Sequence, residues 1–97
     1  MALGTFEGFA PHLNQTFAVG LGASSVEMTL VQATKGQPRD WEGLRKEPFA
    51  LLFKCAHPVV LPQKIYPFEK PGFGKMDIFI VPVGRDRDGF VYQAVFN

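Results

Sequence analysis

Two apolar runs and the charged stretch between them decide the expected fold: Lys75-Met-Asp-Ile-Phe-Ile-Val-Pro-Val-Gly84, Arg85-Asp-Arg-Asp-Gly89 and Phe90-Val-Tyr-Gln-Ala-Val-Phe-Asn97. Both apolar runs are rich in β-branched and aromatic residues, which are typical of strands. The middle stretch is polar and ends in glycine, as the loop of a β-hairpin does. We therefore predict a closing hairpin with a solvated tip and with Gly89 at a positive backbone φ.

Four further segments extend the strand pattern toward the N-terminus. Alternating or continuous apolar residues predict strands over 15–21, 26–34, 49–55 and 64–69. Pro67 and Pro82 lie inside predicted strands. Because proline cannot donate a hydrogen bond to a neighbouring strand, we expect a broken ladder beside Pro67 and a bulge or unpaired edge at Pro82.

The whole pattern predicts a mainly β protein with one domain over residues 1–97. Six short strands joined by turns indicate an antiparallel meander, curled into a small and partly open barrel. A short helical turn is predicted near the N-terminus, with Thr5 as its cap and with Phe6 and Phe9 on one face. The last hairpin is apolar on both sides, so we expect its outer side to be covered by the N-terminal segment or by a second molecule.

Composition limits the classes of partner and the compartment. Ten Lys and Arg side chains stand against nine Asp and Glu, so the chain lacks the clustered positive excess of a nucleic-acid binder. A single cysteine, Cys55, excludes an intramolecular disulfide and fits a reducing compartment. The sequence shows neither a secretory signal nor an apolar run of about 20 residues. We expect a cytoplasmic protein with no membrane partner, while incorporation into a particle or export by a non-standard route stays open.

Two groups of residues resemble parts of metal-binding or catalytic sites, but neither group contains all the residues that such a site needs. Cys55 and His57 lie two residues apart, but zinc needs three or four ligands, and the chain has one Cys and two His. We interpret Cys55 as a buried free thiol beside a histidine. Asp86, Arg87 and Asp88 resemble part of a calcium loop, yet no closing acid follows them. We therefore expect no metal, no cofactor and no catalytic residue, and hence a protein that is not an enzyme.

The charged segment over residues 35–48 is the candidate for protein binding. It is 14 residues long and contains the only tryptophan of the chain, whereas most connections have about 4–6 residues. A helical turn capped by Asp40 is one option for its structure. Tryptophan and arginine are enriched at binding hot spots, so the predicted protein-binding residues are Arg39, Trp41, Leu44 and Arg45. The alternative is that Trp41 folds back and plugs one end of the barrel.

The C-terminal half carries a pattern that resembles a known family. The segments concerned are Glu-Pro-Phe-Ala-Leu-Leu-Phe-Lys at 47–54, Leu-Pro-Gln-Lys-Ile-Tyr at 61–66, Asp-Ile-Phe-Ile-Val-Pro-Val-Gly-Arg-Asp at 77–86 and Tyr-Gln-Ala-Val-Phe-Asn at 92–97, together with 6–17. They resemble a family of uncharacterised bacterial proteins about one domain long, often encoded near phage-tail-collar-like proteins. The resemblance implies a part in a tail-like or surface assembly, and it implies no activity and no catalytic residues.

These observations suggest three functions. The leading hypothesis is a non-enzymatic protein-binding or assembly module, acting by self-association or on a different protein. The second is a small-molecule or lipid carrier whose ten phenylalanines line a cavity, although a barrel of six strands should be filled by its own side chains. The third is an oligonucleotide-binding barrel with Phe49, Phe53 or Tyr66 for stacking and Lys54 or Lys64 for phosphates, which the balanced charge disfavours.

Overall fold

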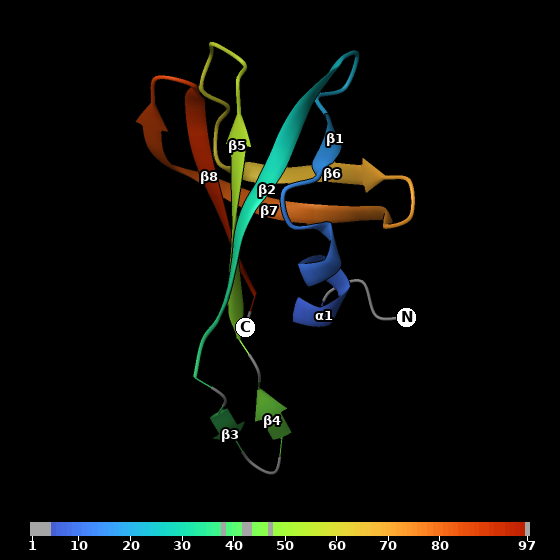
Figure 1. Ribbon diagram of the computed structural model, residues 1–97, viewed down its shortest axis with the longest axis vertical. Coiled ribbons are helices and arrows are strands. Elements are labelled where there is room, and N and C mark those ends of the chain that lie inside the picture. Colours follow the sequence, from blue (N-terminus) through green and yellow to red (C-terminus); the bar gives the residue numbers. More distant parts are fainter. Residues whose placement is uncertain (1–4, 38, 42–43, 47, 97) are drawn as a thin grey trace.

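The computed structural model describes residues 5–37, 39–41, 44–46 and 48–96. The elements in chain order are α1 (Phe6–Phe9), the 3₁₀ helix η1 (Ala10–His12), β1 (Thr16–Gly20), β2 (Ser25–Lys35), β3 (Arg39–Trp41), β4 (Leu44–Lys46), β5 (Phe49–Cys55), β6 (Lys64–Lys70), β7 (Gly74–Asp86) and β8 (Gly89–Phe96). Within the described residues, six of these strands form a closed antiparallel barrel. In Figure 1, β2, β5 and β8 run roughly vertically, and β6 and β7 run nearly horizontally behind them. The predicted barrel and its N-terminal helical turn are confirmed.

The order of the strands around the barrel is β1-β2-β5-β8-β7-β6, and β6 pairs back to β1. The barrel is therefore closed rather than partly open. The prediction of a simple meander is wrong at one connection, because β5 pairs with β8 and not with β6. Residues 56–63 carry the chain from the end of β5 to β6, past the two strands that lie between them.

Two tyrosines hold this crossing segment against the barrel. The Leu61 N–H donates a hydrogen bond of 2.9 Å to the Tyr92 hydroxyl. The Tyr66 hydroxyl donates to the carbonyl of Pro62 at 2.7 Å. Burial raises the pKa of both tyrosines, so both hydroxyls stay protonated at neutral pH.

The long strand β7 pairs with two different strands, β6 and β8. Its segment Gly74–Ile80 pairs with β6, and the following residues pair with β8. The register shifts between Pro82 and Gly84, which confirms the bulge expected at Pro82. On the other side of β6, pairing with β1 stops at Phe68, next to Pro67. Pro67 thus lies where the β1–β6 ladder ends, and Pro82 lies where the register of the β7–β8 ladder shifts.

The interior is filled by phenylalanine rings. Phe17, Phe53 and Phe68 are fully buried, and their ring centroids lie 4.9 to 6.3 Å apart. Such spacings are those of aromatic rings in direct contact. The barrel is therefore packed at this level by its own side chains, as expected for a barrel of six strands.

The N-terminal helical turn closes one end of the barrel. The Thr5 side chain accepts the Gly8 N–H at 3.1 Å, so Thr5 caps α1 as predicted. Phe6 and Phe9 both contact Phe49, with centroids about 6 Å away. The segment thus covers an end of the barrel, where β5 begins, and leaves the outer side of the last hairpin uncovered.

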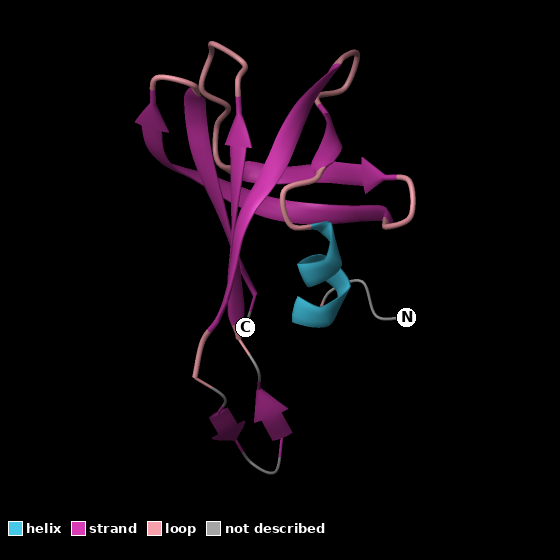
Figure 2. Ribbon diagram, viewed as in Figure 1, coloured by secondary structure: helices cyan, strands magenta, loops and turns pink. Residues whose placement is uncertain are grey.

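The charged segment after β2 forms a hairpin rather than a helical turn. β3 and β4 pair in antiparallel register, with Asp40 opposite Arg45, and extend beyond the barrel (Figure 2). The option of a helical turn capped by Asp40 is therefore wrong. Strand pairing gives the backbone groups of both arms partners, which one isolated helical turn cannot do. In the part of the chain that is described, no helix is both long and apolar enough to cross a membrane.

Candidate functional site

The structure brings the four predicted protein-binding residues into one hairpin. Arg39 and Trp41 belong to β3, Leu44 and Arg45 belong to β4, and Trp41 lies opposite Leu44 in the register. The side chains of these residues lie outside the described part of the structure. Their role in protein binding, and the alternative that Trp41 plugs the barrel, both stay predictions.

A second candidate surface is an apolar band on the outside of the barrel. We use the name outer apolar band for Leu52, Ile65, Phe79, Val81, Val83 and Val95. Ile65 and Phe79 lie directly opposite each other on β6 and β7, and their exposed fractions are 58% and 51%. Val83 and Val95 are exposed to 52% and 58%. Large apolar side chains at this exposure, grouped on paired strands, are typical of a surface that binds another molecule.

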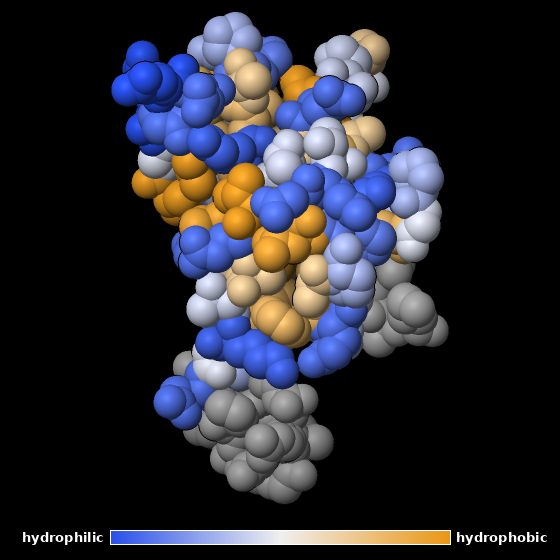
Figure 3. All heavy atoms as spheres, viewed as in Figure 1, coloured by the Kyte–Doolittle hydropathy of each residue, from blue (hydrophilic) through white to orange (hydrophobic). Residues whose placement is uncertain are grey.

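The strand register places the members of the band on one outer face from β6 to β5, with the polar residue Gln93 between Val81 and Leu52. Phe79 and Val81 are two residues apart on β7 and therefore lie on the same face. Val81 lies opposite Gln93 of β8, which in turn lies opposite Leu52 of β5. Figure 3 shows apolar side chains gathered over β5 and β8. The sequence indicated the β7 and β8 part of this band through its two-sided hairpin, whereas Leu52 and Ile65 become part of it only through strand pairing.

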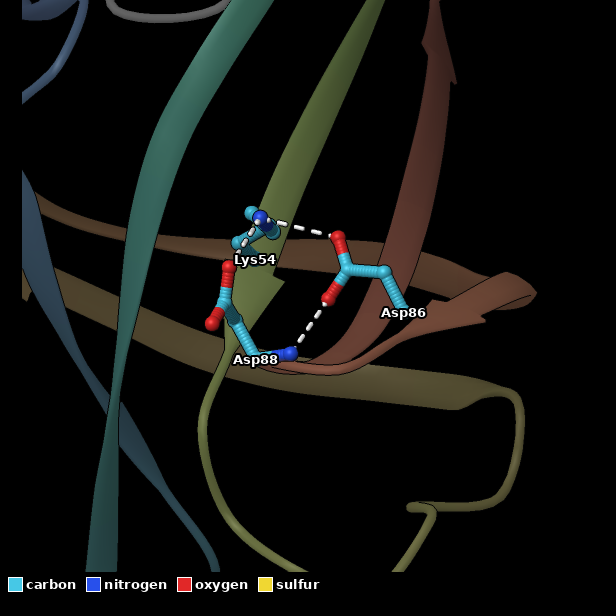
Figure 4. A network of polar contacts seen from close by, with 3 residues as sticks. All are labelled: Lys54, Asp86 and Asp88. Carbon is cyan, nitrogen blue, oxygen red and sulfur yellow. Dashed lines mark hydrogen bonds and ion pairs between the residues drawn. The ribbon is translucent and has the colours of Figure 1, made fainter.

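The tip of the last hairpin is held by a lysine from another strand. Lys54 Nζ lies 2.8 Å from Asp86 Oδ2 and 3.5 Å from Asp88 Oδ2, and the Asp88 N–H donates to Asp86 Oδ1 at 2.8 Å (Figure 4). The hydrogen bond from Lys54 lowers the pKa of Asp86 below its usual value, and the Asp88 N–H adds to this effect. The same contact with Asp86 raises the pKa of Lys54. The tip is exposed as predicted, but its attachment to β5 was missed because nothing in the sequence pairs β5 with β8.

A glycine brings this tip against the end of β5. Gly89 has a φ of +140°, which confirms the predicted positive value. A Cβ atom at Gly89 would lie 2.1 Å from the Cys55 carbonyl oxygen and 2.9 Å from Ala56 Cα. No side chain can occupy that space, so glycine permits the close approach of the two backbones.

An open pocket lies beside this close approach, at the mouth of the barrel. This mouth pocket has a volume of about 300 Å³ and is lined by residues 56–58 and 85–90. The Arg85 guanidinium lies over the Phe90 ring, 5.8 Å from its centroid. His57 and Arg87 also line the pocket. The pocket therefore combines two arginines and two aspartates with one aromatic wall.

Cys55 is the last residue of β5, and His57 follows it two residues later. Cys55 is buried and free, as predicted. Nδ1 of His57 contacts the backbone of Val59 at 3.2 Å. Within the described residues, no three His, Cys, Asp or Glu side chains gather closely enough to hold a metal ion.

Comparison with known proteins gives one match. Residues 4–96 match the family model described as a domain of unknown function, DUF6916. The chain belongs to this family. No curated protein and no solved structure matches the chain. The family description names no activity, so the function of this DUF6916 domain has to be inferred from its geometry.

That geometry weighs against two of the three functions considered from the sequence. Phe49, Phe53 and Tyr66, proposed as stacking residues for nucleic-acid bases, are all buried in the core of this DUF6916 domain and cannot meet a base. The same core weighs against a carrier, because phenylalanine rings in mutual contact occupy the space that a ligand would need.

Proposed function

We propose that this DUF6916 domain is a non-enzymatic protein-binding or assembly module, which binds through the outer apolar band. The observation that carries the proposal is the exposed cross-strand pair of Ile65 and Phe79. Burying such a pair against a partner contributes about 25 cal/mol per Å² of apolar surface removed from water. Aromatic residues are also enriched in the cores of protein interfaces.

The resemblance noted in the sequence extends the proposal to a bacterial phage-tail-like or surface assembly, in which the domain is an accessory part made in the cytoplasm. The β3–β4 hairpin, with Arg39, Trp41, Leu44 and Arg45, is proposed as a second contact of the same assembly. In this proposal, neither a membrane, a nucleic acid nor a metal ion is a partner.

The test compares the wild type with the double variant Ile65→Thr and Phe79→Thr. Threonine keeps a β-branched or strand-compatible side chain at both positions, while most of the apolar area is lost. Val59→Thr is the matched control, because Val59 is 62% exposed and lies outside the outer apolar band. Light scattering across a concentration series measures self-association, and capture from the native host with identification of the bound proteins measures binding to other proteins.

We expect the wild type and Val59→Thr to form the same oligomer or to capture the same partner. The double variant loses that oligomer or that partner while its thermal unfolding stays cooperative. The proposal is wrong if all three proteins are monomers at high micromolar concentration and capture identical sets of proteins.

A further inference from the structure

The mouth pocket is held in shape by contacts that do not depend on a ligand. Gly89 lets the hairpin tip approach the backbone of Cys55 and Ala56, and Lys54 binds the tip to β5 through two carboxylates. The other wall is formed by residues 56–58 of the crossing segment, and this segment is tied down further along the chain, where Leu61 bonds to Tyr92 and Pro62 to Tyr66. A site with fixed walls binds without a large ordering cost.

The charges at the mouth pocket are divided between two faces of β7. Asp86 faces outward and binds Lys54. Arg85 is the residue before Asp86 in β7, so its side chain lies on the opposite face of the strand, and in the register it lies opposite Phe90. Among the described residues, Arg85 and Arg87 form no ion pair. Asp88 is also bound by Lys54, so both carboxylates of the pocket lining have a lysine beside them, whereas the two arginines of the lining have no described carboxylate within ion-pair distance.

The hydrogen-bond donors at the mouth pocket match an anionic ligand. The two guanidiniums offer planar pairs of donors, which match a carboxylate. When the neutral His57 ring accepts the Val59 N–H at Nδ1, its proton resides on Nε2 and this nitrogen is a donor as well. The Phe90 ring holds the Arg85 guanidinium in place by a cation–π contact.

We propose that the mouth pocket binds a carboxylate, through Arg85 and Arg87 with His57 as an additional donor. A carboxylate accepts two parallel hydrogen bonds from one guanidinium, and its single charge is repelled less by Asp86 and Asp88 of the lining than a phosphate dianion would be. The volume of about 300 Å³ fits a small acid or one acidic side chain. This inference goes beyond the proposed function, because it concerns a different surface and a different chemistry.

The test is an NMR titration of the full chain, labelled with ¹⁵N, at low and constant ionic strength. N-acetylglycine represents a free small carboxylate, and an acetylated Gly-Asp-Gly amide represents an acidic protein segment. N-acetylglycinamide and the Gly-Asn-Gly peptide are their neutral twins, and inorganic phosphate is the competing anion. The tighter of the two carboxylate probes identifies the source of the ligand.

We expect saturable shifts of the backbone amides of residues 56–57 and 85–90 with the carboxylates and none with the neutral twins. Arg85→Gln and Arg87→Gln should each weaken binding about tenfold, the usual effect of losing a hydrogen bond to a charged group. Lys75→Gln removes the same charge from the other end of β7 and should leave the affinity unchanged. Unchanged thermal unfolding of the arginine variants shows that they fold.

Four results would overturn the proposal: no local shifts, equal shifts with the neutral twins, tighter binding of phosphate than of both carboxylates, or an equal loss of affinity in Lys75→Gln. None of them involves the outer apolar band. The two proposals therefore succeed or fail separately.

Discussion

At the scale of single residues, Gly89 decides how closely the last hairpin meets the rest of the barrel. Its positive φ follows from the turn composition, but the space around it does not. The Cys55 carbonyl lies where a side chain would begin. Gly89 is therefore required by its neighbours as well as by its backbone conformation.

Gly89→Ala should lower the free energy of unfolding by about 2–4 kcal/mol, because the new methyl group overlaps the backbone of β5. Gly84→Ala is the matched control, since no atom lies within 4 Å of the position of its Cβ and its φ is not positive. Urea unfolding of the two variants measures the difference. Equal stabilities would show that the hairpin tip does not pack against β5 as described.

At the scale of elements, the Lys54 contact joins β5 to the turn between β7 and β8. The pKa of Asp86 is lowered in the folded protein below its ordinary value of 3.8. A carboxyl of this kind stabilises the fold at pH values above about 4, the value expected in the unfolded chain. That stability is lost as the pH falls through the lowered pKa of the folded state.

Lys54→Gln should therefore raise the pKa of Asp86 toward its ordinary value. The variant should also lose less stability than the wild type between pH 6 and pH 3. NMR titration of the side-chain carboxyl gives the pKa, and urea unfolding at the two pH values gives the stability. Lys75→Gln serves as the control for a general change in charge, and an Asp86 pKa that stays low in Lys54→Gln would contradict the role assigned to Lys54.

The elements were largely predictable because each strand carries its own pattern. The segment Phe49–Cys55 alternates buried and half-buried residues and was predicted with its observed bounds. The pairing of Lys54 with Val91 was not predictable, since neither residue carries a signal for its partner strand. The hairpin of β3 and β4 was missed because three-residue strands are too short to show a period. The candidate sites depend on pairing, so the sequence indicated them only in part.

At the scale of the whole molecule, the barrel depends on the α1 segment to close one end. Phe9 is fully buried, and its ring lies 5.1 to 6.0 Å from those of Phe49, Phe73 and Phe96. A domain of this size unfolds with a free energy of about 5–15 kcal/mol. The contacts of one such ring therefore contribute a large share of the free energy of unfolding.

Phe9→Ala should cost about 3–5 kcal/mol of stability, as expected when a buried phenylalanine is truncated. Phe79→Ala makes the same chemical change at a position that is half exposed, and it should cost about 1 kcal/mol or less. Urea unfolding of both variants under identical conditions measures the contrast. Similar losses at the two positions would mean that α1 does not close the barrel.

The position of β8 between β5 and β7 has a consequence during protein synthesis. β8 follows the other five barrel strands along the chain, yet it forms hydrogen-bonded ladders with two of them, β5 and β7. Until the ribosome has released it, β5 and β7 present bare edges to other nascent chains, which makes them prone to misassembly. Closure of this barrel is therefore a late event, and a slow exit of its final strand would favour aggregation over folding.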